Sequence, residues 1–259
     1  MKLPAGQNTK SFKLGKKPAK FDKRTLLLGK YLTQELNPPP PSVDYGKAVP
    51  NWPMFGNDSL GDCTIAAAGH MIEVWTANTG VEKTLAESAI EGAYNHFSGG
   101  NPDAGANMLD VLNYWRKTGI GKDKIHAFAQ IEPKNNLQTQ DAIYLFGNCY
   151  IGVSLPNFAV VPGHFLDTPW IVPPSGPVGD AAPNPNNGHC IPAVAYDPRN
   201  IWIVTWGALK SMSWQFYNTY AEEAYAVLSL DWINKKRKTA PSGFNLAALE
   251  SDLSAVTTV

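Results

Sequence analysis

The stretch GNDSLGDCTIAAA, residues 56 to 68, decides the fold because it places a cysteine where a turn becomes a helix. Gly61 and Asp62 precede Cys63, and the alanines after it favour helix. Apolar residues then recur at positions 68, 71, 72 and 75, so we expect a helix from Cys63 to about Asn78. A thiol in the first turn of a helix feels the positive end of the helix dipole, which lowers its pKa. Cys63 is therefore a candidate nucleophile, and the alternative is a small buried core residue.

The charge of the chain is balanced overall but unevenly distributed. Residues 1 to 30 hold nine Lys or Arg and a single acid, Asp22, whereas the other 229 residues hold 13 of the 22 basic and 21 of the 22 acidic side chains. We expect a solvated basic arm that lies against its own acidic body, and we do not expect a nucleic-acid partner.

The sequence also indicates where the chain works. The first residues contain no apolar region typical of a signal peptide, and no stretch reaches transmembrane length, so no membrane association is expected. Three cysteines are too few, and odd in number, for a disulfide framework. These features predict a reducing compartment, the cytoplasm, and leave the oligomeric state open.

Composition and periodicity divide the chain into an extension and one domain. Residues 1–41 form a basic extension that ends in four prolines, with one short helix expected over 23–36. Residues 42–259 form the domain, with a helical lobe over about 42–125, a β lobe over about 126–232 and a tail over 233–259. Further helices are expected at 84–96, 106–117, 138–146 and 246–256, and strands at 127–131, 149–155, 189–196, 201–205 and 220–230. This arrangement predicts an α+β fold.

A thiol nucleophile needs a base, and His189 is the candidate. It begins a buried strand directly after a long loop at 162–188 that is rich in Pro, Gly and Asn. A lone histidine at the start of a strand is otherwise structural. Cys149 and Cys190 are expected to be core residues. The Cys and His spacing fits no metal site, and no phosphate-binding loop is present, so neither metal nor cofactor is expected.

The order of these residues resembles the papain-like cysteine peptidases. In its first half, that family shows an extended Val-Asp segment and an amide residue six positions before a Gly-x-Cys that begins a helix. Glycines precede a later helix. In its β half, a His begins one strand and a Trp-Gly pair ends another. The matching segments here, from about residue 42 to 232, are Val43-Asp44-Tyr45, Asn57, Gly61-Asp62-Cys63, Gly99-Gly100, Gly105, Gly188-His189, Trp206-Gly207 and Ala224-Tyr225.

The resemblance implies a two-lobed fold whose helical lobe precedes an antiparallel, barrel-like β lobe, with the active site between them. It implies hydrolysis of peptide bonds by a Cys63 thiolate and His189 imidazolium pair through a thioester. Trp206 would shield the pair from water, and the glycines at 99, 100 and 105 would line the site for a peptide or protein substrate. Only about 40 residues precede Val43, fewer than the large inhibitory segment that the family often carries, so the basic arm is a candidate latch.

Two residues depart from the family pattern. Asn57 stands where the family has the Gln of the oxyanion hole; it carries the same amide donor on a shorter side chain, and its alternative role is to cap a turn. Thr205 falls where the family has the Asn that orients the histidine, and its alternative role is that of an ordinary β-forming residue.

Three other interpretations stay open. Peptidases attached to bacteriocin exporters also place an amide residue before Asp-Cys, but their later Asp-Pro corresponds poorly to Asp197-Pro198, which follows His189 too closely. A catalytically silent papain-fold module that binds a peptide or protein is favoured by Asn57 and Thr205. A thiol-dependent acyl transferase would use the same chemistry.

Overall fold

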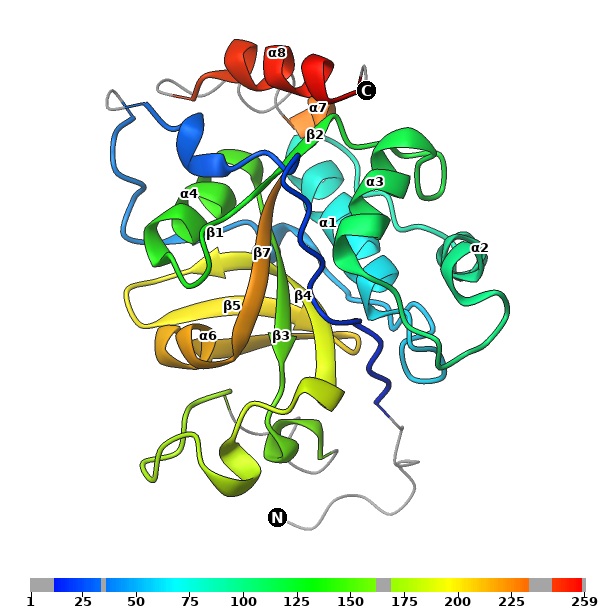
Figure 1. Cartoon of the computed structure of the whole chain (residues 1–259), viewed down its shortest axis with the longest axis vertical. Coiled ribbons are helices and arrows are strands. Elements are labelled where there is room, and N and C mark those ends of the chain that lie inside the picture. The colour runs from blue at the N-terminus through cyan, green and yellow to red at the C-terminus, as the bar shows by residue number, and fades with distance from the viewer. Residues whose placement is uncertain (1–11, 34–35, 162–168, 233–243, 258–259) are drawn as a thin grey trace.

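The computed structural model describes residues 12–33, 36–161, 169–232 and 244–257. The helices are α1 (Cys63–Thr79), α2 (Glu87–Ser98), α3 (Met108–Lys117), α4 (Asn136–Phe146), α6 (Trp214–Tyr220), α7 (Leu230–Trp232) and α8 (Leu246–Thr257). Helices α1, α2 and α3 gather on one side of the molecule, and the antiparallel sheet lies on the other side with α4 and α6 (Figure 1). This arrangement confirms the α+β class predicted from the sequence.

The sheet has seven strands, all paired in antiparallel fashion. Its strands are β1 (Val43–Asp44), β2 (Ala127–Gln130), β3 (Cys149–Ser154), β4 (Gly188–Tyr196), β5 (Asn200–Thr205), β6 (Ala208–Ser213) and β7 (Ala221–Leu228). Their order is β2-β7-β3-β4-β5-β6, and the short β1 pairs with β4 away from this path. The lead-in to the helical lobe thus joins the sheet directly.

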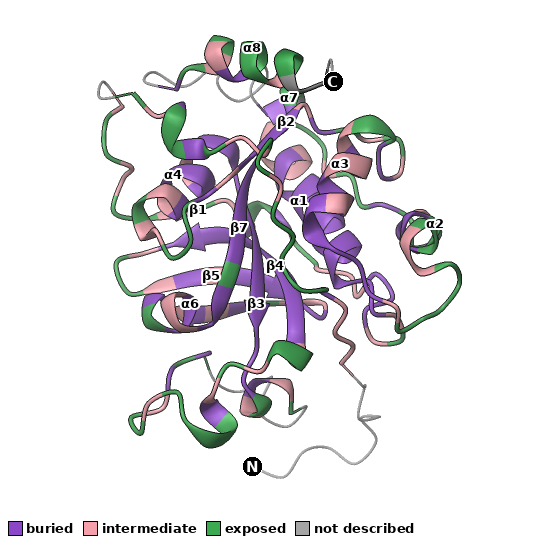
Figure 2. Ribbon diagram, in the orientation of Figure 1, coloured by how far each residue is buried: buried purple, intermediate pink, exposed green. Residues whose placement is uncertain are grey.

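Helix α1 is the centre of the packing. Every residue from Cys63 to Trp75 is buried, and so are β3 and β4 along their whole lengths (Figure 2). A helix that packs on all sides belongs in a core, and the small alanines of α1 allow this close packing. The Tyr150 hydroxyl on β3 donates a 2.7 Å hydrogen bond to the Thr64 carbonyl and so fixes the first turn of α1 against the sheet.

A tight hairpin joins β4 to β5. The Asp197 carboxylate accepts hydrogen bonds of 2.7 Å from the backbone N–H groups of both Arg199 and Asn200, as Asp does in turns. Because the two strands are antiparallel, the beginning of β4 and the end of β5 lie at the same end of the sheet. His189 and Thr205 are brought together in this way.

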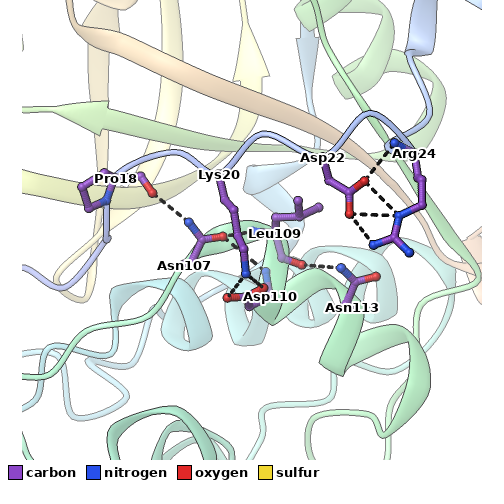
Figure 3. A network of polar contacts seen from close by, with 8 residues as sticks. All are labelled: Pro18, Lys20, Asp22, Arg24, Asn107, Leu109, Asp110 and Asn113. Carbon is purple, nitrogen blue, oxygen red and sulfur yellow. Dashed lines mark hydrogen bonds and ion pairs between the residues drawn. The ribbon is translucent and has the colours of Figure 1, made fainter.

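The extension follows the boundary between the helices and the sheet. In Figure 1 it is the dark blue segment that runs between α3 and β4. Asn107 caps α3 by accepting from the N–H groups of Leu109 and Asp110, and its amide donates to the Pro18 carbonyl at 2.8 Å (Figure 3). Lys20 forms an ion pair with Asp110 at 2.8 Å. The extension is therefore fastened to the start of α3.

Two segments differ from the expectations. The helix expected over 23–36 is wrong: in the described part of that range, which leaves out residues 34 and 35, the structure has only a short 3₁₀ turn at Leu28–Lys30. Backbone pairing replaces the helix, because the Gln130 N–H donates to the Leu26 carbonyl at 2.7 Å and Leu27 bridges Gln130 at the edge of β2. The other difference is the segment after Gly207, where β6 and α6 form although neither was expected.

Within the described residues, no helix is both long enough and apolar enough to cross a membrane.

Candidate active site

The candidate nucleophile and base lie at the starts of two packed elements. Cys63 is the first residue of α1, and His189 is the second residue of β4. Both border one small cavity of about 10 Å³, together with Asn57, Thr205 and Trp206. A cavity of this size holds at most about one water molecule. The structure thus brings together five residues from two distant parts of the sequence, 57–63 and 189–206, and it leaves no room for a substrate beside them.

The His189 imidazole is held on two sides. Its Nε2 lies 2.7 Å from the Thr205 hydroxyl. The Trp206 ring stacks on the imidazole with a centroid distance of 4.3 Å. Trp206 has a φ of +46°, a conformation that costs free energy for a residue with a side chain, and it begins the turn between β5 and β6. The other ring nitrogen, Nδ1, is buried and has no hydrogen-bond partner among the described residues.

The extension closes the site through its backbone. The Gly188 carbonyl, directly before His189, accepts from the N–H groups of Gly15 at 3.2 Å and Lys16 at 3.1 Å. On the opposite side, Ala106 donates to the Gly15 carbonyl at 2.8 Å and accepts from Lys17 at 3.0 Å. The fit is tight at Gly15, because a Cβ there would lie 1.8 Å from the Gly61 carbonyl oxygen.

Trp206 covers His189, and residues 12 and 13 in turn cover Trp206. The Phe12 ring stacks on Trp206 with a centroid distance of 4.7 Å. The Trp206 indole donates to the Lys13 carbonyl at 2.9 Å, and the Lys13 N–H donates to the Asn57 carbonyl at 3.1 Å. In this arrangement Cys63 and His189 are each only 1 % exposed. These contacts are made by residues 12–20 of the basic extension, and this segment alone is called the arm below.

Burial sets the charge state of the pair. It raises the pKa of the Cys63 thiol to about 12, although the N–H groups of Cys190 and Gly15 act in the opposite direction. It lowers the pKa of His189 to about 3. Our expectation of a lowered thiol pKa is therefore wrong for this arrangement, because loss of water outweighs the helix dipole. With the arm in place, the two groups are a neutral thiol and a neutral imidazole at neutral pH.

The residue before the nucleophile adds to this effect. Asp62 is fully buried, and neither of its carboxylate oxygens has a well-formed hydrogen bond among the described residues. Burial raises its pKa to about 8, with the nearby Asn57 amide acting in the opposite direction. When Asp62 is ionised, its negative charge raises the pKa of the Cys63 thiol further.

Asn57 is engaged in the turn that precedes α1. Its amide donates to the Leu60 carbonyl at 3.0 Å, so it does cap a turn, the alternative role considered from the sequence. An amide nitrogen has two hydrogens, so this bond uses one of the two. Its role in an oxyanion hole stays a prediction.

The three glycines expected at the substrate side are divided between two places. Gly99 ends α2 in the left-handed conformation, and a Cβ on either Gly99 or Gly100 would meet nothing within 4 Å among the described residues. Gly105 instead touches the arm, because a Cβ there would lie 2.4 Å from the Gly15 carbonyl oxygen.

Several polar residues of this region were not expected at the site from the sequence. His70, two turns along α1 from Cys63, borders the same cavity and lies 2.9 Å from the buried Glu73 carboxylate. Lys16 of the arm reaches Glu222 and Glu223 on β7. The one sequence signal was the pair of adjacent glutamates inside an otherwise apolar strand.

The fold and the position of the site define a class. The chain has the fold of the papain-like cysteine proteases, with α1 to α3 before strands β2 to β7 and the buried Cys63 helix packed on the sheet.

Particular solved structures are similar to it at low sequence identity. Xylellain, a cysteine protease from Xylella fastidiosa, is 15 % identical with a TM-score of 0.62, covering 86 % of this chain and 98 % of its own. A Carica candamarcensis cysteine protease, solved in complex with E-64, is 17 % identical with a TM-score of 0.53, covering 73 % and 99 %. The ragweed pollen allergen Amb a 11, a cysteine protease in its proform, is 16 % identical with a TM-score of 0.53, covering 76 % and 67 %.

The sequence comparisons add nothing to this likeness. No family model matches the chain, and no curated protein matches it.

The buried His189 makes stability depend on pH. Its pKa lies near 3 in the folded protein and near 6.5 when unfolded, so the unfolded state binds the proton first. Its contribution is fully present above pH 6.5 and is lost as the pH falls towards 3, with about 2 kcal/mol lost between pH 7 and pH 5. Urea unfolding of the wild type should show this loss, and H189Q should lack it. The exposed His96 provides a matched control, since H96Q should behave as the wild type does; equal pH dependence in H189Q and the wild type would contradict the account.

Proposed function

We propose that this chain is a papain-like cysteine peptidase that hydrolyses peptide bonds with Cys63 as nucleophile and His189 as base. The observation that carries the proposal is the shared cavity, in which a thiol at a helix start meets an imidazole whose Nδ1 is unpaired. The fold supports it, since the solved structures similar to this chain are cysteine proteases. An unpaired buried nitrogen is costly, and a role as base gives a reason for keeping it.

The reaction follows from the two groups once a substrate replaces the arm. His189 Nδ1 takes the proton of the Cys63 thiol, and the thiolate attacks the carbonyl carbon of the scissile bond. The backbone N–H of Cys63 and the second amide hydrogen of Asn57 stabilise the oxyanion. His189 then gives its proton to the leaving amine, which departs and leaves a thioester. Water, deprotonated by His189, attacks the thioester, releases the acid product and restores the thiol.

Thr205 and Trp206 act on the histidine. A threonine hydroxyl that accepts from Nε2–H leaves Nδ1 unprotonated, which is the tautomer a base requires. The Trp206 ring excludes water from one face of the imidazole and holds its plane. We assign both as positioning residues.

The arm acts as a latch in this proposal. It occupies the space beside Cys63, uses the backbone groups of Gly188 and Ala106 that an extended peptide would use, and removes water from the pair. Activity therefore requires displacement of the arm, after which water and substrate reach the site. Return of water favours the charged forms of both groups and removes the cause of their shifted pKa values.

Labelling by E-64 with peptide mapping tests the proposal. We expect modification of Cys63 and not of Cys149 or Cys190, which are buried core residues. G15A should label faster by about tenfold or more, because the added Cβ cannot fit beside Gly61 and forces the arm out. H189A should lose the labelling in the G15A background.

Two controls make this result specific. G92A adds a Cβ in the middle of α2, where it meets nothing, and should label as the wild type does. C63A should not be labelled. Absence of labelling in G15A, or labelling that persists without His189, would favour the catalytically silent binding module.

Thr205 can be tested separately in the G15A background. T205V keeps the shape of the side chain but removes the acceptor for Nε2, so we expect the rate of Cys63 labelling to fall by about tenfold, the cost of one hydrogen bond. T205S retains the hydroxyl and should restore most of the rate. Equal rates for T205V and T205S would mean that Thr205 is only a strand residue.

A further inference from the structure

The arm carries a lysine that is buried, although lysines are almost never fully buried unless paired. The Lys16 side chain is 1 % exposed. Its ammonium donates to the Glu222 carboxylate at 2.8 Å and to the Lys17 carbonyl at 3.1 Å, and it lies 3.5 Å from Glu223. An extension that only needed to cover a cleft would not require this side chain at this depth.

The pocket around Lys16 belongs to the sheet and α3. We call it the acidic pocket, and its walls are Gly152 and Ser154 of β3, Glu222 and Glu223 of β7, and Met108 of α3. A Cβ on Gly152 would lie 2.5 Å from Lys16 Cε and 2.6 Å from Met108 Sδ, so only glycine leaves the space open. A position kept free of a side chain between two packed elements indicates a built cavity.

The two carboxylates are held by residues outside the arm. The Ser154 hydroxyl donates to Glu222, and the Tyr225 hydroxyl donates to Glu223 at 2.9 Å. Glu223 is 2 % exposed, and its Oε1 has no hydrogen-bond partner among the described residues; the Lys16 ammonium is the charge that faces it. The pocket is thus arranged for a cation independently of the arm.

The protonation of the pocket fits a cation as its occupant. Burial pushes the pKa of Glu222 upward, but hydrogen bonds from Lys16 and Ser154 outweigh it and lower that pKa. Burial raises the pKa of Glu223, against the influence of Lys16. Without a bound cation, Glu223 would be a buried acid with no opposite charge beside it, next to Glu222, whose side chain is 36 % exposed.

The acidic pocket lies next to the candidate nucleophile, because the arm residue beside Cys63 is followed directly by the residue that fills the pocket. Gly15, the neighbour of Lys16, is close enough to Cys63 for its N–H to lower the pKa of the thiol. The Lys16 backbone is bonded to Gly188, which precedes His189, and a Cβ on Gly188 would lie 2.2 Å from the Lys16 carbonyl oxygen. A peptide chain that passes Cys63 therefore delivers a neighbouring side chain into this pocket.

We propose that the acidic pocket is the specificity pocket of the enzyme and that it selects peptide substrates with a lysine or arginine side chain next to the site of attack. In the closed state, Lys16 of the arm takes the place of that side chain in the pocket. This inference rests on the proposed function, because it names the substrates of the same site. When the arm leaves, a basic side chain of the substrate replaces Lys16 between the two carboxylates.

Matched probes test the pocket in the full chain carrying G15A. The probes are tripeptidyl epoxides that carry lysine or norleucine at each of the three positions in turn, since norleucine keeps the four-carbon stem and lacks the ammonium. We expect the lysine probe to label Cys63 about tenfold faster or more at one position. E223Q and E222Q should each bring the two rates towards equality. D110N is the matched control, because Asp110 binds the arm's Lys20 outside the pocket, and it should keep the lysine preference.

The outcome separates the pocket from the chemistry. Equal rates for lysine and norleucine at all three positions would overturn the pocket while leaving the peptidase intact. If neither probe labels Cys63, the proposed function fails. The preference of the pocket is then measured by fluorescence anisotropy, with the same peptides without the epoxide and with the double variant C63A and G15A. A preference for lysine there, lost in E223Q, would support the pocket; equal or absent binding of the two peptides would overturn it.

Discussion

Residues 15–17 are hydrogen-bonded through their backbone to Ala106 and Gly188, and the Lys13 N–H donates to the Asn57 carbonyl; the state of the candidate site depends on this contact of residues 13–17. One chain of five residues closes the space beside Cys63, supports Trp206 and places Lys16 in the acidic pocket. Because these contacts are mostly backbone hydrogen bonds on both sides, they order the arm without demanding many particular side chains. The exceptions are Gly15, where any side chain would collide with Gly61, and Lys16.

The contact of the arm can control the site because the fold fixes both reactive groups before any substrate binds. Helix α1 is buried along most of its length and is tied to β3 through Tyr150 and Thr64. His189 is set by the pairing of β4 with β3 and β5 and by the Thr205 hydroxyl. Neither group can be moved far without disturbing the core. Access to them is therefore changed at a lower free-energy cost by moving a short segment outside the core. Access and charge state then change together when the arm moves.

The sequence predicted the parts of the fold that rest on strong local patterns. The alanine-rich helix after Cys63 and the apolar hairpin around Asp197 have clear periodicity and turn chemistry, and both were placed within a few residues. The helix expected over 23–36 failed because backbone pairing with Gln130 outweighs helix propensity there. The expected charge state of Cys63 was also wrong, since burial by a segment some fifty residues away leaves no trace in the local sequence. The acidic pocket was hidden for the same reason: Lys16 meets Glu222 and Glu223 only in three dimensions.

The central claim is that the arm keeps Cys63 and His189 neutral by excluding water. The pH dependence of Cys63 alkylation by iodoacetamide, compared between the wild type and G15A, tests it most directly. We predict that the wild type reacts slowly and only at strongly alkaline pH, because burial raises the pKa of the thiol to about 12. G15A should react faster, with a midpoint below the ordinary thiol value of about 8.5. Superimposable profiles for the two proteins would contradict the account.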